Sequence, residues 1–174
     1  MVLFSLAFVY YMVLVKPFAI CYNIGMMTHE NWMRHALTLA EEAALAGEVP
    51  VGCVIVDADG NMVGRGRNRR EELGQAAAHA EMLAIDEACR VLGDWRLGDC
   101  TLYVTLEPCP MCAGAIINAR VGTVFFGAKD ATVGACGSVI NLFMERFGHY
   151  PAVTGGVLED ECARKMTDFF RRIR

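Results

Sequence analysis

Two short clusters of residues that can bind a metal stand out in this sequence, His79 with Glu81 and Cys109 with Cys112. Two thiolates and one imidazole make three protein ligands for zinc. A site with three ligands leaves the fourth tetrahedral position open to water, which is typical of catalytic rather than structural zinc. Glu81 lies two residues from His79, near enough to reach that water without being a ligand. These residue types predict hydrolytic zinc chemistry in which Glu81 moves protons.

Both clusters are predicted to lie in the first turn of a helix. Residues 78–92 have helical periodicity, and residues 102–106 form a buried strand that leads into the cysteine pair. Pro110 suits the start of a helix, because its missing N–H would have had no partner there. Cys109 and Cys112 are three positions apart, so both sulfurs face one side, and a helix N-terminus favours their thiolate form.

Each motif alone has other interpretations. A lone Cys-x-x-Cys is more often a redox pair or half of a zinc knuckle. A structural zinc would need a fourth ligand, and Cys89, Cys100 and Cys136 are not spaced as knuckle partners. With 30 positions from His79 to Cys109, the two motifs together form the His-x-Glu…Pro-Cys-x-x-Cys signature known from zinc-dependent base deaminases.

The rest of the chain predicts one α/β domain that positions these helices. Asp59-Gly60 is a hairpin signal, residues 69–75 form a polar loop, and a Gly-rich connection at 134–138 precedes a short helix. The order of elements predicts a mixed five-stranded sheet with helices on both faces. Helices are expected near 28–46, 78–92, 110–119 and 159–172, and strands near 51–57, 62–68, 102–106, 121–127 and 153–158.

Residues 1–26 are predicted to be an apolar extension outside the deaminase domain, which spans residues 27–174. A membrane helix needs about 20 apolar residues, and here Lys16-Pro17 would fall inside the span, the Lys costing roughly 2.5–3.5 kcal/mol near its centre. A secretory signal should open with positive charge and close with a small-x-small site, and neither feature is present. Three interpretations stay open: a mis-annotated start or dispensable extension, which we prefer, a membrane anchor, and a cleaved signal.

Charge and cysteine content narrow the class of protein. A net charge of −4 and a pI near 5.6 argue against binding nucleic acid by bulk charge, although they are compatible with a local basic patch. Eight cysteines need not form disulfides, because free buried cysteines are ordinary in reducing compartments. We expect a cytoplasmic protein with no obligatory membrane partner.

Seven further motifs extend from about residue 28 to the C-terminus. They are Val-Pro-Val-Gly (49–52), Gly-Arg-Gly-Arg-Asn (64–68), Ala-His-Ala-Glu-Met (78–82), Thr-Leu-Tyr-Val-Thr-Leu-Glu-Pro-Cys (101–109), Gly-Ala-Lys-Asp (127–130), Gly-Ala-Cys-Gly-Ser (134–138) and Asp-Phe-Phe-Arg (168–171). In these motifs the chain resembles the bacterial tRNA-specific adenosine deaminases of the cytidine/deoxycytidylate deaminase superfamily. The resemblance implies a three-layer cytidine-deaminase-like fold, a homodimer and one Zn²⁺ per subunit. It also implies conversion of the wobble adenosine of a tRNA anticodon to inosine, with zinc-activated water attacking C6 and Glu81 as the proton shuttle.

The same resemblance implies which residues would hold the RNA. Asn68 would contact the target base, Ala80 would offer its backbone N–H to it, and Asp130 would lie against a flanking nucleotide. Phe169 and Phe170 would belong to the tail that covers the RNA. Simpler interpretations stay open, with Asn68 as a turn residue at the end of a strand and Asp130 as a loop cap.

Two features bear on the fit to RNA. The chain has Gln75-Ala76-Ala77-Ala78 where the family usually has Asp-Pro-Thr-Ala, so the loop entering the active site is expected to differ in shape. Four arginines lie between residues 65 and 70, and either phosphate contacts or a solvated hairpin end would explain them.

Two rival functions are compatible with parts of the sequence. A guanine or nucleoside deaminase would share the zinc site and Pro-Cys-Pro-Met-Cys at 108–112, whereas the motifs at 105–107, 127–130 and 134–138 favour a tRNA deaminase. A non-catalytic RNA-binding module would use zinc as a structural ion, and it would keep its function without Glu81.

Overall fold

The computed structural model describes residues 27–172, in which helices and strands alternate. The apolar extension at 1–26 lies outside the described residues. Within residues 27–172, no helix combines the length and the apolar character needed to cross a membrane. The elements are α1 (His29–Leu45), β1 (Gly52–Val56), β2 (Met62–Arg67), α2 (Arg70–Leu73), α3 (Ala80–Leu92), β3 (Thr101–Leu106), α4 (Pro110–Asn118), β4 (Thr123–Ala128), the 3-10 helix η1 (Leu142–Met144), β5 (Ala152–Gly155) and α5 (Glu159–Arg172).

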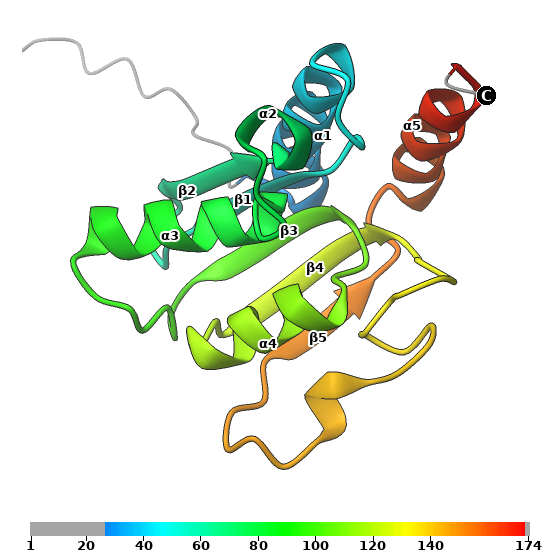
Figure 1. Cartoon of the computed structure of the whole chain (residues 1–174). Coiled ribbons are helices and arrows are strands. Elements are labelled where there is room, and N and C mark those ends of the chain that lie inside the picture. The colour runs from blue at the N-terminus through cyan, green and yellow to red at the C-terminus, as the bar shows by residue number, and fades with distance from the viewer. Residues whose placement is uncertain (1–26, 173–174) are drawn as a thin grey trace, which may run out of the picture.

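The strands form one mixed sheet of five strands in the order β2-β1-β3-β4-β5. β1 pairs antiparallel with β2 and with β3, while β3–β4 and β4–β5 are parallel. Helices α3 and α4 lie over one face of this sheet, and α1 and α5 lie on the other (Figure 1). The predicted mixed sheet with helices on both faces is confirmed.

Two apolar cores fill the spaces between the three layers. Along β1, Cys53 and Ile55 point into the core under α3 and α4, whereas Val54 and Val56 point into the core under α1 and α5. Successive side chains of a strand face opposite sides of a sheet, and both sides of this one are covered. That is why all five residues of β1 are buried.

Small residues bring α3 unusually close to β2. A Cβ on Gly66 would overlap the carbonyl oxygen of Ala80, and one on Gly64 would overlap that of Ala84. Because these two glycines have no Cβ, the backbone of α3 packs directly against β2. As a result, the N-terminus of α3 lies beside the end of β2, and this contact brings the His79 cluster next to Asn68.

Two elements differ from the sequence expectation. The polar loop expected at residues 69–75 contains the short helix α2, which ends at Gly74 in the left-handed conformation (φ 60°). Glu72 of this helix forms ion pairs with Arg67 and Arg69, a pattern that a polar composition does not distinguish from a solvated loop. The last strand is also shorter than expected, because the chain turns at Gly156 and Leu158, both with positive φ.

Candidate active site

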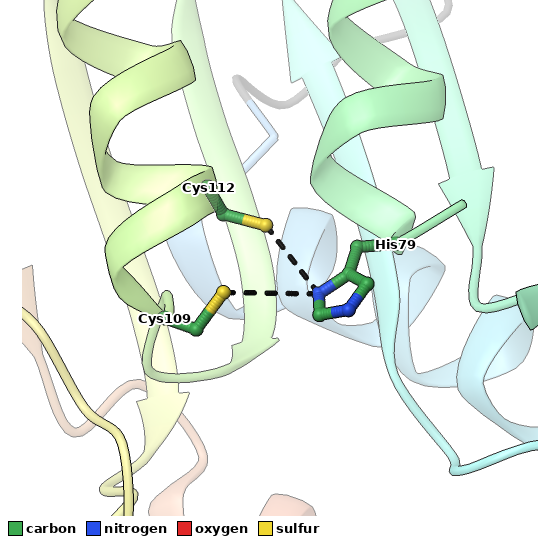
Figure 2. Close-up of side chains that lie close together, drawn as sticks. All are labelled: His79, Cys109 and Cys112. Atoms are coloured by element: carbon green, nitrogen blue, oxygen red, sulfur yellow. Dashed lines mark hydrogen bonds between the residues drawn. The ribbon is translucent and has the colours of Figure 1, made fainter. Parts of the chain in front are cut away.

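Three side chains that could hold a metal ion meet where α3 and α4 begin. His79 is the N-cap residue of α3, and Cys109 is the N-cap residue of α4. The Nδ1 atom of His79 lies 3.5 Å from Sγ of Cys112 and 3.8 Å from Sγ of Cys109 (Figure 2). The side chains thus converge from two neighbouring helix N-termini, as their sequence positions predicted.

The separations within this group fit a tetrahedral zinc ion. With Zn–S bonds of about 2.3 Å and a Zn–N bond of about 2.0–2.1 Å, tetrahedral geometry places nitrogen and sulfur about 3.5 Å apart. The three donor atoms lie within 4.8 Å of one another, and within residues 27–172 no fourth His, Cys, Asp or Glu joins them. A site of this composition leaves one coordination position for a water molecule.

Hydrogen bonds set the protonation of these donor atoms. The hydrogen bonds from Cys112 and His79 lower the pKa of the Cys109 thiol to about 4, although burial opposes this. The bond to Cys109, together with burial, raises the pKa of Cys112 far above its usual range. Cys109 is therefore a thiolate, the form that binds metal, and a divalent cation would compete with the proton that Cys112 holds.

Glu81 lies in the first turn of α3 and is only 4 % exposed. Burial raises the pKa of its carboxyl, while the charge of His79 acts in the opposite direction. A carboxyl group whose pKa is shifted towards neutrality can both accept and return a proton during a reaction. Glu81 is not part of the group of three donor atoms that lie within 4.8 Å of one another, although its carboxyl group contacts the side chain of Cys112.

A cavity of about 520 Å³ opens onto these residues, a volume typical of small-molecule sites. One side is formed by the end of β2 and the start of α3, and the opposite side by α5 and the segment that follows β4. The lining includes Val49, Val51, Asn68, Arg70, His79, Ala80, Glu81, Cys109, Lys129, Asp130, Thr132, Met166 and Phe170.

Of the five residues predicted to contact the base or the RNA, four line this cavity, and Phe169 is not among the lining residues. Asn68 follows β2 and is 6 % exposed, and Ala80 is the first residue of α3, where backbone N–H groups lack partners within the helix. Phe170 projects from α5 and meets the ring of Phe169 edge to face, with the centroids 5.4 Å apart. The Oδ1 atom of Asp130 also accepts hydrogen bonds from the backbone N–H groups of Thr132 (2.8 Å) and Val133 (3.2 Å). Asp130 therefore caps its own loop as well.

The four arginines between residues 65 and 70 have different surroundings. Arg67 and Arg69 are paired with Glu72, whereas Arg70 lines the cavity. Arg65 lines a separate groove that contains none of His79, Cys109 and Cys112. Arg70 is therefore the arginine of this group best placed to meet a phosphate at the site.

Two buried carboxylates next to the site were not predicted as site residues from the sequence. Glu107 is 2 % exposed and accepts hydrogen bonds from the backbone N–H groups of Asp130 (3.0 Å), Cys136 (2.9 Å) and Ser138 (3.1 Å), and from the Ser138 hydroxyl. These bonds outweigh the burial of Glu107 and lower its pKa. The second carboxylate, Glu48, is 1 % exposed and contacts Asn68. Glu107 lies within the motif at 101–109, which was its only indication, whereas Glu48 lies just before the motif at 49–52 and in none of the seven.

Comparisons with known proteins agree with this geometry. Residues 26–128 match the cytidine and deoxycytidylate deaminase zinc-binding region. The chain is 50 % identical over 150 residues to the tRNA-specific adenosine deaminase of Bacillus subtilis (strain 168), which covers 86 % of this chain and 92 % of the relative.

Two solved structures bear on the substrate. One, from studies of A-to-I editing by tRNA:A34 deaminases at the wobble position of transfer RNA, is 43 % identical with a TM-score of 0.74, over 77 % of this chain and 97 % of that one. The guanine deaminase of Bacillus subtilis is 47 % identical with a TM-score of 0.57, over 59 % of this chain and 66 % of that one. Because the zinc-binding region matches over residues 26–128 and these similarities extend over most of the chain, the chain belongs to the cytidine and deoxycytidylate deaminase family and, within it, to the tRNA-specific adenosine deaminases.

Proposed function

We propose that this protein hydrolytically deaminates adenosine to inosine at the wobble position of a tRNA anticodon. The observation that carries the proposal is the buried Glu81 beside a His79–Cys109–Cys112 group on the wall of a cavity. The identity of 50 % to a tRNA-specific adenosine deaminase supports the choice of substrate. The guanine deaminase structure covers a smaller share of this chain than the tRNA deaminase structure does, so a free base such as guanine is the second candidate substrate.

In the proposed mechanism, His79, Cys109 and Cys112 would hold a zinc ion, which would supply the acidity needed to use water as a nucleophile near neutral pH. Glu81 accepts the proton of this water and delivers it to the purine ring while oxygen adds to C6. Glu81 then carries a second proton to the departing amino group, so that adenosine and water give inosine and ammonia. Its burial next to the ligands suits a group that must change protonation state twice.

The walls of the cavity would orient the base. Asn68 would hydrogen-bond the purine, and the N–H of Ala80 would point to it from the start of α3. Asp130 would lie against a flanking nucleotide and Phe170 would cover the RNA, as expected for a base turned out of a loop rather than one stacked in a helix.

Comparison of two substrates tests the proposal. The wild-type protein and the Glu81→Gln variant are incubated with an anticodon stem-loop RNA and with guanine, and inosine and ammonia are measured. We expect inosine in RNA from the wild type, and a loss of about 10²–10⁴-fold in the variant with its zinc content retained. Turnover of guanine without inosine in RNA would establish the second candidate instead. A fully active variant would contradict any catalytic role for Glu81.

We also propose that the protein is a cytoplasmic homodimer with one zinc ion per subunit. Large apolar side chains are exposed around the outer side of α4, where Trp95 and Phe147 are 49 % and 55 % exposed and border a hollow of about 330 Å³. Exposed apolar patches of this kind are typical of protein interfaces. Light scattering should give twice the subunit mass, and Trp95→Glu should lower it towards that of the monomer. Metal analysis should give one zinc per chain.

A further inference from the structure

Glu48 is a buried carboxylate directly behind the wall of the active site. It lies between α1 and β1 and is 1 % exposed, whereas its neighbour Asn68 forms part of the cavity wall. Its Oε2 atom accepts a hydrogen bond from Nδ2 of Asn68 at 3.3 Å, and its Oε1 atom accepts one from the backbone N–H of Glu72 at 2.8 Å. Both donors are N–H groups, so each carboxylate oxygen acts as an acceptor.

The end of α1 holds Glu48 in this place. Gly47 adopts a positive φ of 80°, and its N–H donates to the carbonyl of Ala44. The N–H of Glu48 donates to the carbonyl of Ala43 at 2.9 Å. These two bonds form a Schellman motif, which ends the helix and fixes the direction of the next residue. Glu48 is therefore part of the rigid scaffold rather than of a free loop.

The contact fixes which end of the Asn68 amide faces the cavity. An amide carries a donor group on one side and an acceptor on the other, and it can turn over by 180°. Because the oxygen of Glu48 accepts, the nitrogen of Asn68 must face it. The carbonyl oxygen and the second N–H of Asn68 are then left for a ligand. Burial of a carboxylate is costly unless it is hydrogen-bonded, which is consistent with a specific task for Glu48.

We propose that Glu48 is a positioning residue for the deamination reaction, which acts by holding the Asn68 amide in the one orientation that matches the purine. This inference rests on the proposed role of Asn68 in base binding. Glu48 also joins this amide to α2, so a single carboxylate sets both the base contact and the adjacent wall.

A double-mutant cycle tests this role. Glu48→Gln keeps the size of the side chain but replaces one acceptor by a donor, so it either turns the Asn68 amide over or loses the bond to Glu72. The kcat/KM for an anticodon stem-loop, zinc content and melting temperature are measured for the wild type, Glu48→Gln, Asn68→Ala and the double variant. The control is Glu87→Gln, in which a partly buried carboxylate bonded to the backbone N–H of Arg65 (2.7 Å) lies away from the cavity.

If Glu48 acts through Asn68, its substitution should lower kcat/KM about tenfold in the wild type and about twofold or less in the Asn68→Ala background. The control should keep wild-type kcat/KM. Equal losses in both backgrounds, or full activity of Glu48→Gln, would overturn the inference. If Glu48→Gln does not fold, Glu48→Asp takes its place in the cycle, and failure of both to fold with zinc would show a folding role only. Full activity of Asn68→Ala would instead refute the proposed role of Asn68.

Discussion

Glu107 is the residue whose replacement tests most directly how the wall of the active site is held. Its two carboxylate oxygens accept four hydrogen bonds from the segment at 130–138. Gln at this position keeps the shape but has one oxygen fewer. The least costly orientation turns the new NH₂ group towards Ser138, whose hydroxyl can rotate to accept. The N–H of Asp130 then loses its acceptor, and the remaining bonds lose the negative charge.

The size of this effect follows from the number of bonds. A hydrogen bond to a charged group contributes about 1.5–3 kcal/mol, and a neutral one about 0.5–1.5 kcal/mol. We expect Glu107→Gln to lower the free energy of unfolding by about 2–4 kcal/mol, given one bond lost and others weakened. For a chain of this size the melting temperature would fall by about 5–15 °C.

Thermal unfolding and amide hydrogen exchange measure the two consequences. The amide of Asp130 should exchange faster in Glu107→Gln because it loses its acceptor, and the amides of Cys136 and Ser138 should exchange somewhat faster because their acceptor loses its charge. Ser138→Ala serves as the control, since it removes the hydroxyl bond alone, at a cost of about 1.5–3 kcal/mol, and leaves the acceptor of the Asp130 amide in place. An unchanged melting temperature and unchanged exchange in Glu107→Gln would refute the view that this carboxylate anchors the wall.

Three further substitutions test other parts of the structure. Gly66→Ala would place a methyl group against the carbonyl of Ala80 and push α3 away from the sheet. We expect the free energy of unfolding, measured by chemical denaturation, to fall by about 1–3 kcal/mol and the activity to fall as well. Wild-type values for both would contradict the close packing. Cys112→Ser should reduce bound zinc by metal analysis and lower the melting temperature, because metal binding favours the folded state, and retention of a full equivalent of zinc would exclude this ligand. Hydrogen bonds from Arg69 and Arg67 lower the pKa of Glu72 to about 2. In a carbon-13 NMR titration, Arg69→Ala should therefore raise the pKa of Glu72 towards 4.5. The stabilising contribution of the ionised Glu72 is present above pH 4.5 and is lost as the pH falls towards 2.

The metal-binding group was readable from sequence because its chemistry is local. Cys109 and Cys112 share one turn of helix, and His79 opens another, so residue spacing alone predicted how each side chain points. Alternating apolar residues and Asp59-Gly60 likewise predicted the first hairpin, and β1 and β2 pair as expected. These features depend on neighbours within a few residues of the same segment.

The buried carboxylates depended on contacts that no local pattern encodes. Glu48 and Asn68 are 20 positions apart, and Glu107 and Ser138 are 31 apart, so these pairs meet only once the sheet has assembled. In the sequence, a single Glu beside an apolar strand is indistinguishable from a solvated one, because burial and hydrogen-bond partners are properties of the fold.

The sequence by itself determined the candidate ligand types, their positions at helix N-termini and the alternating α/β order, since propensity and side-chain spacing act over short distances. Only the tertiary structure decided that α5 closes the cavity with Phe170, that Asp130 caps its own loop, and that Glu48 and Glu107 hold the two walls. Those arrangements arise from packing between layers, where the position of each group is set by residues far away along the chain.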